Sequence, residues 1–238
     1  MDNQFSRTEL LLGEKSLDIL KKSHVAIFGI GGVGGFVTEA LARIGVGNFD
    51  LIDNDTVCLS NLNRQIIATH SSLGKYKVDE MKNRILDINP NANVNVFKCF
   101  YLPETKNLFD FTNYDYVIDA VDTVTAKIQL ILQAKEANTK IISCMGTGNK
   151  LEPTKFEITD IEKTSVCPLA RVMRQECKKR GIKNVKVLFS KEKPLTPKQD
   201  ISSQNKNHKI APGSVSFVPS VAGLIIAGEV VKDLTSII

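Results

Sequence analysis

The sequence predicts an α/β fold built on a doubly wound, mostly parallel sheet. Short apolar runs alternate with helix-length amphipathic segments through the first 150 residues, a pattern typical of parallel strands covered by helices on both faces. The first apolar run leads into a glycine-rich turn, GIGGVG at 29–34, and the second, NFDLID at 48–53, ends on an acid. Together these features indicate a Rossmann-like nucleotide-binding sheet with a phosphate-binding turn after its first strand.

The elements of the first half follow from that alternation. Residues 1–24 are expected to form an N-terminal arm and helix ahead of a nucleotide-binding half at 25–150. Hydrophobic periodicity then predicts each strand and helix in turn. The strands lie at 25–29, 48–53, 93–97, 114–121 and 140–145, and the helices lie at 33–45, 76–88 and 125–138.

The pattern changes after Gly148, where we expect a substrate and dimerisation half, 151–238, within one domain spanning 1–238. A polar, proline-containing stretch there predicts a long flexible loop. The expected elements are added antiparallel strands at 154–158 and 185–189, a basic helix at 167–180, the flexible loop near 190–213, a strand at 214–218 and a last buried helix at 220–234.

The composition excludes several classes of protein. The five cysteines are an odd number and form no Cys-x-x-Cys pair, so neither a disulfide framework nor a four-cysteine zinc site is expected. The N-terminus lacks the apolar core of a signal peptide, which favours a cytoplasmic protein. Residues 211–228 carry no charge over 18 positions, a length that borders on a membrane span. Pro212 and Pro219 divide that stretch, so we expect no membrane association.

The glycine turn has a physical logic at each position. Gly29 permits a tight turn, Gly31 lets the backbone approach phosphate, and Gly34 lets the helix pack against the strand, with Gly32 between them. The helix N-terminus that follows offers free N–H groups and a positive dipole end. Asp53 lies 24 residues beyond Gly29, where it is placed for ribose hydroxyls or, alternatively, to cap its own loop.

Further motifs narrow the identity of the nucleotide. The glycine turn is followed by LIDNDTVCLSNLNRQ at 51–65, a lysine twelve residues later, and IDAVDT at 118–123. In this order the motifs resemble the ubiquitin-activating-enzyme-like adenylating superfamily, which includes the activators of molybdopterin and thiamin biosynthesis. The resemblance implies that the chain binds ATP rather than a nicotinamide and forms acyl adenylates.

The chain also resembles the tRNA threonylcarbamoyladenosine dehydratases. This resemblance rests on RTELLLGE at 7–14, GTGNKLEPTKFEITDIEKTSVCPLARVMRQECKKRGI at 146–182 and VLFSKEKP at 187–194. It implies an enzyme that adenylates the carboxylate of threonylcarbamoyladenosine, next to the anticodon of tRNA, and cyclises it with release of AMP and pyrophosphate. It further implies Mg²⁺, a homodimer, a monovalent cation and a sulfur-relay partner protein, the last two without assigned residues.

The resemblance assigns roles to individual residues. Arg64 and Lys77 bring positive charge to the phosphates, Asp122 binds the metal, and Arg7 reaches across a dimer as an arginine finger. Fixed cations suit the reaction, because a carboxylate that attacks a triphosphate needs positive charge around it. Cyclisation is intramolecular, so no cysteine nucleophile is expected. The nucleotide-contacting set is Gly29, Gly31, Gly32, Gly34, Asp53, Asp55, Asn61, Arg64 and Lys77, in which Asp55, like Gln65, is expected mainly to shape the loop.

Each of these assignments has a simpler alternative. Arg64 and Lys77 are then ordinary surface charges, and Asp122 is the N-cap of the following helix. Arg7 is then a solvated residue of an arm that folds back on its own subunit.

Positive charge is concentrated in residues 161–210, which hold 13 Lys/Arg and 4 Asp/Glu, a net charge of +9 in a chain of +5. Such clustering indicates either a solvated face or a polyanionic partner, and the resemblance names tRNA as that partner. At helical spacing the first three of the candidate contacts share one face. The candidates are Arg171, Arg174, Lys178, Lys179 and Arg180.

Three other functions remain as alternatives. The chain could activate the C-terminus of a ubiquitin-like carrier protein, although such activators often keep a zinc on two Cys-x-x-Cys pairs that this sequence lacks. It could sense a nucleotide without catalysis, but it retains Arg64, Lys77 and Asp122. A hydride-transferring dehydrogenase would share only the glycine turn.

Overall fold

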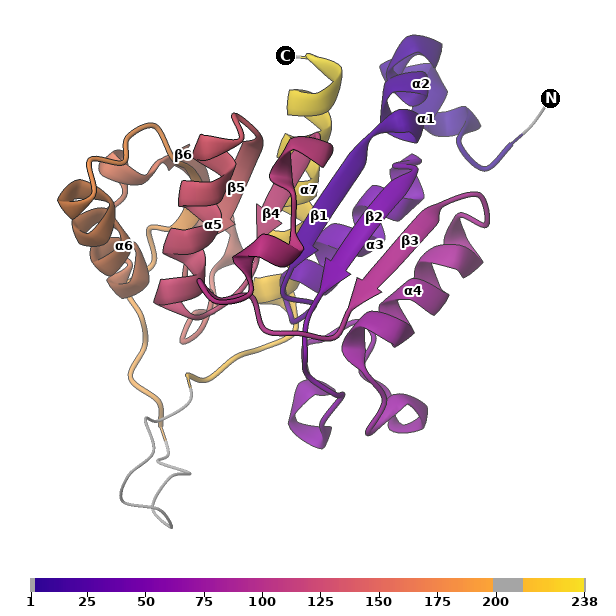
Figure 1. The fold of residues 1–238 in the computed structure, drawn as a ribbon. Helices are drawn as coiled ribbons and strands as arrows, with labels where there is room; N and C mark the ends of the chain where they lie inside the picture. The colour runs from indigo at the N-terminus through magenta and orange to yellow at the C-terminus, as the bar shows by residue number, and fades with distance from the viewer. Residues whose placement is uncertain (1–2, 199–211, 238) are drawn as a thin grey trace.

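The computed structural model describes residues 3–198 and 212–237, which form a seven-stranded sheet with helices on both faces (Figure 1). The strand order is β3-β2-β1-β4-β5-β7-β6, and every neighbouring pair is parallel except β6 with β7. This arrangement confirms the α/β, mostly parallel architecture. The strands are β1 His24–Phe28, β2 Asn48–Ile52, β3 Asn93–Phe97, β4 Tyr116–Asp119, β5 Lys140–Cys144, β6 Phe156–Asp160 and β7 Lys186–Ser190.

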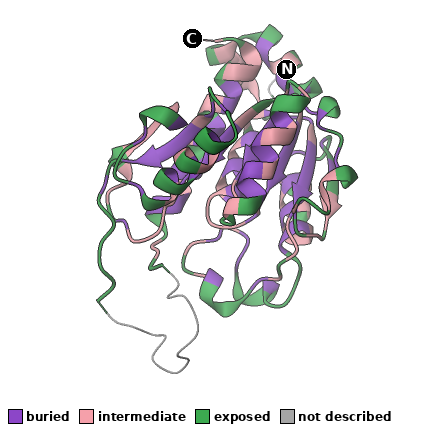
Figure 2. Ribbon diagram, turned by 60° about the vertical axis from the view of Figure 1, so that its left-hand side comes forward, coloured by how far each residue is buried: buried purple, intermediate pink, exposed green. Residues whose placement is uncertain are grey.

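Side-chain alternation along the strands divides the core into layers. In β1, Val25 and Ile27 face the layer built from α3, α4 and α7, whereas Ala26 and Phe28 face α5 and a cluster of aromatic rings. The helix α6 packs against α5 beside β7. Buried residues accordingly follow the strands and the inner helix faces (Figure 2). The helices are α1 Ser6–Leu12, α2 Glu14–Lys22, α3 Gly34–Ile44, α4 Lys77–Ile88, α5 Val124–Glu136, α6 Pro168–Lys179 and α7 Phe217–Thr235.

The sheet changes direction of winding between β1 and β4. From β1 the chain proceeds to β2 and β3 on one side, and β4 and β5 continue on the other. The connections that leave β1 and β4 therefore diverge, and they open a crevice beyond the carboxyl ends of these strands. In open α/β sheets, ligands bind at such a point.

Two glycines allow the turn after β1 to pack tightly. Gly29 has φ +92°, and a Cβ there would lie 2.8 Å from the carbonyl oxygen of Ala120. A Cβ on Gly34 would lie only 1.8 Å from the carbonyl oxygen of Gly29. Only glycine fits at these positions, so the turn lies directly against the connection between β4 and α5.

Several expected elements differ from the structure. Residues 214–218 do not form a strand, because α7 begins at Phe217 and the oxygen of Ser214 accepts the side-chain amide of Asn63. Pro219 is accommodated in the first turn of α7, where its missing N–H is not needed. The strand expected at 114–121 spans only Tyr116–Asp119. The backbone N–H of Tyr114 still closes the preceding turn at Phe111–Asn113, and the chain crosses the glycine turn after Asp119.

The second half of the chain differs from its expected form in the direction of one added strand. Of the two added strands, only β6 runs antiparallel to the rest of the sheet, since β7 runs parallel to β5. Residues 191–198 have no regular structure, and the rest of the loop expected near 190–213 lies largely outside the described residues. Within the described ranges, no helix combines the length and hydropathy needed to cross a bilayer.

Candidate functional site

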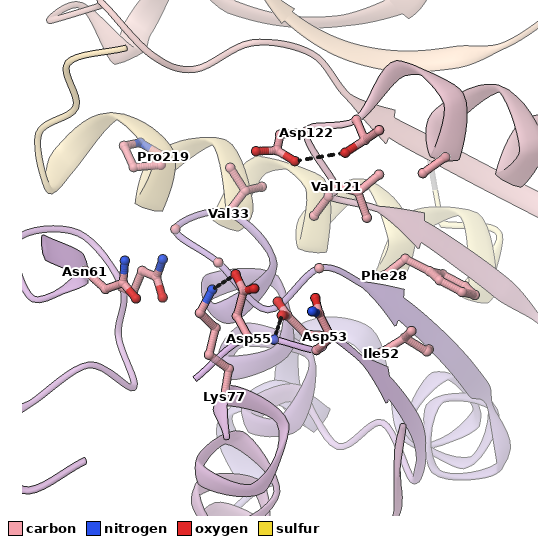
Figure 3. Close-up of a pocket in the computed structure, with 18 of the residues that line it drawn as sticks. Phe28, Val33, Ile52, Asp53, Asp55, Asn61, Lys77, Val121, Asp122 and Pro219 are labelled. Carbon is pink, nitrogen blue, oxygen red and sulfur yellow. Dashed lines mark hydrogen bonds and ion pairs between the residues drawn. The ribbon is translucent and has the colours of Figure 1, made fainter. Parts of the chain in front are cut away.

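A pocket with a cavity volume of about 450 Å³ occupies the crevice at the carboxyl ends of β1, β2 and β4 (Figure 3). Its floor is the glycine turn, and its walls come from seven other parts of the chain. Those parts are the end of β2 at 52–55, the loop at 61–65, the start of α4 at Lys77, residues 99–101 after β3, the β4–α5 connection at 120–123, and residues 147–148 with 212–219.

Most of the expected site residues meet in this pocket. Gly34 does not line the pocket, but it allows the glycine turn to pack tightly. Arg7 and the candidates on α6 lie elsewhere. The expected residues that line the pocket are Gly29, Gly31, Gly32, Asp53, Asp55, Asn61, Arg64, Lys77 and Asp122.

Asp53 ties the end of β2 to the glycine turn. Its Oδ2 accepts the N–H of Ile30 at 2.7 Å, and its Oδ1 accepts the N–H of Asp55 at 2.8 Å. Burial raises the pKa of the Asp53 carboxyl, and nearby Lys77 opposes that rise. The capping role is therefore present. Because each carboxylate oxygen accepts two hydrogen bonds, Asp53 can also accept a bond from a hydroxyl in the pocket.

Lys77 places a cation inside the pocket rather than on the surface. Its side chain is only 6% exposed, and Nζ lies 2.7 Å from Oδ2 of Asp55. The backbone N–H of Lys77 also donates to the carbonyl of Asp55 at 3.0 Å. Burial excludes the interpretation of Lys77 as an ordinary surface charge. Asp55 is its counterion, a role that the sequence did not indicate.

The loop at 61–65 contributes three polar side chains. Asn61 accepts the N–H of Cys58 through Oδ1 at 3.1 Å. Half-buried Arg64 donates from Nη1 to the carbonyl of Ser60 at 2.7 Å and to Oδ1 of Asn63 at 2.9 Å. The guanidinium therefore lies at the pocket wall, held by uncharged acceptors that do not neutralise it.

Gln65, which the sequence interpretation expects mainly to shape the loop, lines the pocket. Its side chain is 7% exposed and lines the pocket beside Gly31. Its Oε1 is buried and has no hydrogen-bond partner among the described residues. A buried acceptor without a partner is costly and rare, so this carboxamide fits a pocket that is completed by a bound ligand. Its position next to Arg64 in the NRQ motif was the only signal in the sequence.

Asp122 lies in the β4–α5 connection with its carboxylate exposed at the pocket wall (Figure 3). The N-cap of α5 is Thr123, so the alternative that Asp122 caps this helix is wrong. The contact between Thr123 Oγ1 and Asp122 Oδ1 is long, 3.4 Å. Within residues 3–198 and 212–237, no cluster of three or more His, Cys, Asp or Glu side chains forms a protein-only metal site.

Arg7 lies at the other end of the sheet from the pocket of its own subunit. It is exposed on α1, which stands near the amino ends of the strands (Figure 1). The ring of Phe5, two residues earlier, lies beside Gly45 at the end of α3. The arm therefore does rest on its own subunit, but in a place from which Arg7 cannot reach its own pocket.

The candidate cations on and after α6 are not equivalent. Arg174 turns inward and donates from Nη1 to the carbonyl of Thr164 at 2.8 Å. Lys179 and Arg180 both form ion pairs with Glu176. Arg171 and Lys178 are exposed and form no ion pair with any described residue.

Comparison with known proteins places the chain in a family. The sequence model of the ThiF family matches residues 5–237. The chain belongs to the ThiF family. The tRNA threonylcarbamoyladenosine dehydratase of Bacillus subtilis is 48% identical over 242 residues, which cover 98% of this chain and 95% of that protein.

Other ThiF-type proteins match to different extents. The structure of Escherichia coli tRNA N6-threonylcarbamoyladenosine dehydratase in complex with ATP superposes with a TM-score of 0.88 at 33% identity, covering 98% of this chain and 94% of that one. The molybdopterin-synthase adenylyltransferase of Haemophilus influenzae is 37% identical, but over only 52% of this chain and 51% of its own length.

Proposed function

We propose that this ThiF-family protein is an ATP-dependent tRNA threonylcarbamoyladenosine dehydratase. It adenylates the carboxylate of the modified adenosine next to the anticodon and cyclises the substituent, releasing AMP and pyrophosphate. The observation that carries the proposal is the extent of the match to the B. subtilis dehydratase, which includes both halves of the chain. A tRNA substrate also favours a cytoplasmic location.

The pocket suits the adenylation step. A carboxylate and a triphosphate repel each other, and the pocket offers positive charge from Lys77 and Arg64 together with the amides of the glycine turn. These groups are held in place before ATP arrives, so they stabilise developing charge without reorganisation. Asp53 accepts the ribose hydroxyls. The Gln65 oxygen, which has no hydrogen-bond partner among the described residues, is available to a donor from the bound nucleotide complex.

Asp122 fits a magnesium ion that arrives with the nucleotide. Mg²⁺ commonly binds through one or two carboxylates plus substrate phosphates and keeps several waters. Asp122 presents an exposed carboxylate at the pocket wall and, unlike Asp55, forms no ion pair with a described residue, so it matches that requirement. A protein-only cage does not form among the described residues. The ion would neutralise phosphate charge during attack. We place no residues around a monovalent cation.

The ring-closing step needs no protein nucleophile. The attacking atom and the activated carbonyl belong to the same substituent, so proximity accounts for most of the rate. The surroundings of Cys99, Cys167 and Cys177 agree. Cys167 and Cys177 are each only 2% exposed, and burial raises the pKa of the Cys99 thiol in the pocket wall. Cys167 and Cys177 are therefore inaccessible to a substrate, and the Cys99 thiol ionises less readily than an ordinary thiol.

We further propose a homodimer in which Arg7 completes the pocket of the other subunit. Leu10 and Leu11 on α1 are 90% and 85% exposed, and no residue of this helix is buried. Adjacent exposed leucines on a short helix fit an apolar contact with a second copy. Because Arg7 cannot reach its own pocket, a role in catalysis requires the neighbouring one.

We assign tRNA binding to the exposed side of α6. Arg171 and Lys178 are its principal phosphate contacts, because the other candidate cations are engaged within the protein. A sulfur-relay protein remains a proposed partner of the family type, with no residues assigned to it.

The alternative is activation of a ubiquitin-like carrier protein. The adenylyltransferase of H. influenzae supports it over only half of the chain. Pyrophosphate exchange into ATP distinguishes the two functions. We expect exchange that depends on tRNA carrying threonylcarbamoyladenosine. Exchange that depends on a carrier protein, with none in the presence of this tRNA, would favour the alternative.

A further inference from the structure

A buried ionic cluster behind the pocket has no part in the roles described so far. Lys127 in α5 and Asp119 at the end of β4 have side chains that are 0% exposed, and 3.0 Å separates Nζ from Oδ1. The buried hydroxyl of Ser143 in β5 donates to Oδ2 of Asp119. Lys127 Nζ also donates to the carbonyl of Cys144 at 2.7 Å. The cluster therefore joins β4, β5 and α5.

Such a cluster is a poor source of stability. Withdrawing two charges from water carries a large desolvation penalty, and apolar side chains of similar volume often pack equally well. The better-supported use of a buried ionic group is to specify one geometry among several. In this protein, the geometry that Lys127 and Asp119 can specify is that of the connection between β4 and α5.

The cluster fixes both ends of the connection at 120–123. At one end, Oδ1 of Asp119 also accepts the N–H of Val121 at 3.3 Å. At the other end, Lys127 lies in the first turn of α5, which begins at Val124. The connection between these points carries Asp122 into the pocket wall (Figure 3).

The same connection is pressed against the glycine turn. Ala120 lies so close to Gly29 that a Cβ on the glycine would be 2.8 Å from its carbonyl oxygen. A small displacement of the β4–α5 connection would therefore move Asp122 relative to the phosphate-binding turn. Metal affinity is sensitive to such displacements. Removing a group that orients a metal ligand typically weakens metal binding by about 10–100-fold.

We propose that Lys127, Asp119 and Ser143 are positioning residues that hold Asp122 at the distance needed to share Mg²⁺ with the bound nucleotide. This inference rests on the proposed function in that it takes Asp122 as the metal-binding carboxylate. It does not depend on the identity of the acyl substrate.

The test compares ATP binding with and without Mg²⁺ in a charge-neutral variant. The double variant Lys127→Met/Asp119→Asn removes both charges, so no buried ion is left unpaired. The matched control is Glu39→Gln/Arg84→Met, which removes a pair between α3 and α4 that lines no part of the pocket. Calorimetry gives the ATP dissociation constant in EDTA and in Mg²⁺, and thermal unfolding reports the fold.

We expect all three proteins to bind ATP in EDTA with affinities within about threefold of one another. In the cluster variant, the strengthening of ATP binding by Mg²⁺ should fall by about tenfold or more, while the control keeps the wild-type strengthening. An unchanged Mg²⁺ effect in the cluster variant would overturn the proposal. So would an equal loss of ATP binding with and without Mg²⁺, since the cluster would then support the whole pocket.

A second variant keeps the proposal testable if the double variant does not fold. Ser143→Ala removes one hydrogen bond to Asp119 and leaves the ion pair intact. Its Mg²⁺ effect should fall by a few fold in the same direction, and a wild-type Mg²⁺ effect would count against the cluster. These measurements use no tRNA. A wild-type protein that binds Mg²⁺ and ATP but forms no cyclic nucleoside would refute the proposed function alone.

Discussion

At the scale of single residues, the pocket contains two side chains whose chemistry calls for a bound ligand. Gln65 has a buried carboxamide oxygen without a partner in the described structure. Asp122 presents an exposed carboxylate whose contact with the hydroxyl of Thr123 is long, 3.4 Å. Neither group contributes much to the stability of the ligand-free protein. Replacing either one should therefore change ligand binding much more than stability.

Replacing Gln65 by methionine should separate these two properties. Gln65→Met removes the unpaired acceptor at similar volume, so the free energy of unfolding should be unchanged or rise by about 1 kcal/mol. ATP affinity should nevertheless fall several fold, as measured by calorimetry. Gln133→Met is the control, because Gln133 is fully engaged with Tyr101 and the carbonyl of Phe109 and its replacement should destabilise. Unchanged ATP affinity in Gln65→Met would return Gln65 to a purely structural role.

Replacing Asp122 by alanine should stop turnover without unfolding the protein. The variant lacks the carboxylate assigned to Mg²⁺, and a reduction in AMP release on the order of 100-fold or more is expected. Its thermal unfolding should match that of Asp18→Ala, a control at an exposed position on α2. Near-normal activity of Asp122→Ala at saturating Mg²⁺ would remove Asp122 from the metal site.

At the scale of elements, α6 carries the proposed tRNA-binding surface. The variant Arg171→Glu/Lys178→Glu should bind tRNA more weakly, and its log–log salt slope should fall by about 0.7–0.9 for each phosphate that is no longer neutralised. Lys21→Glu/Lys22→Glu makes the same charge change on α2, at the other end of the molecule, and should leave the slope nearly unchanged. Equal effects of the two variants would show that only net charge matters.

Hydrophobic periodicity in the sequence predicts the bounds of four of the parallel strands. The strands β1, β2, β3 and β5 begin and end within a residue or so of their expected bounds, because apolar side chains recur at the spacing of a buried sheet. The start of α7 was expected to be a strand because SVSFV alternates. The contact that decides its conformation is made by Asn63, about 150 residues away in the chain, and periodicity carries no information about it.

The candidate site, like the fold, is predicted only in part from the sequence. The family resemblance predicted most of the pocket residues, and the parallel sheet brings them together because the carboxyl ends of neighbouring strands meet at one edge. The other features of the site are determined by packing. The counterion role of Asp55, the unpaired oxygen of Gln65 and the inward turn of Arg174 all depend on contacts between segments, and a single sequence does not reveal them.

At the scale of the whole molecule, the proposed dimer links α1 of one subunit to the pocket of the other. Arg7→Ala and Lys77→Ala should each be nearly inactive as homodimers. If Arg7 acts in the neighbouring pocket, refolding the two together should restore about a quarter of wild-type activity, because about half of the dimers are mixed and each has one intact site of two. Failure to recover any activity in mixed dimers, verified by native mass spectrometry, would contradict the exchange of Arg7.

Mass spectrometry of the tRNA nucleosides tests the proposed substrate. Purified protein is incubated with ATP, Mg²⁺ and tRNA that carries threonylcarbamoyladenosine, and the nucleosides are then analysed by mass spectrometry alongside the nucleotides. We expect a modified nucleoside lighter by one water, formed together with stoichiometric AMP and pyrophosphate, and absent when ATP is omitted. An unchanged nucleoside, or a product formed with ADP in place of AMP, would contradict the proposed function.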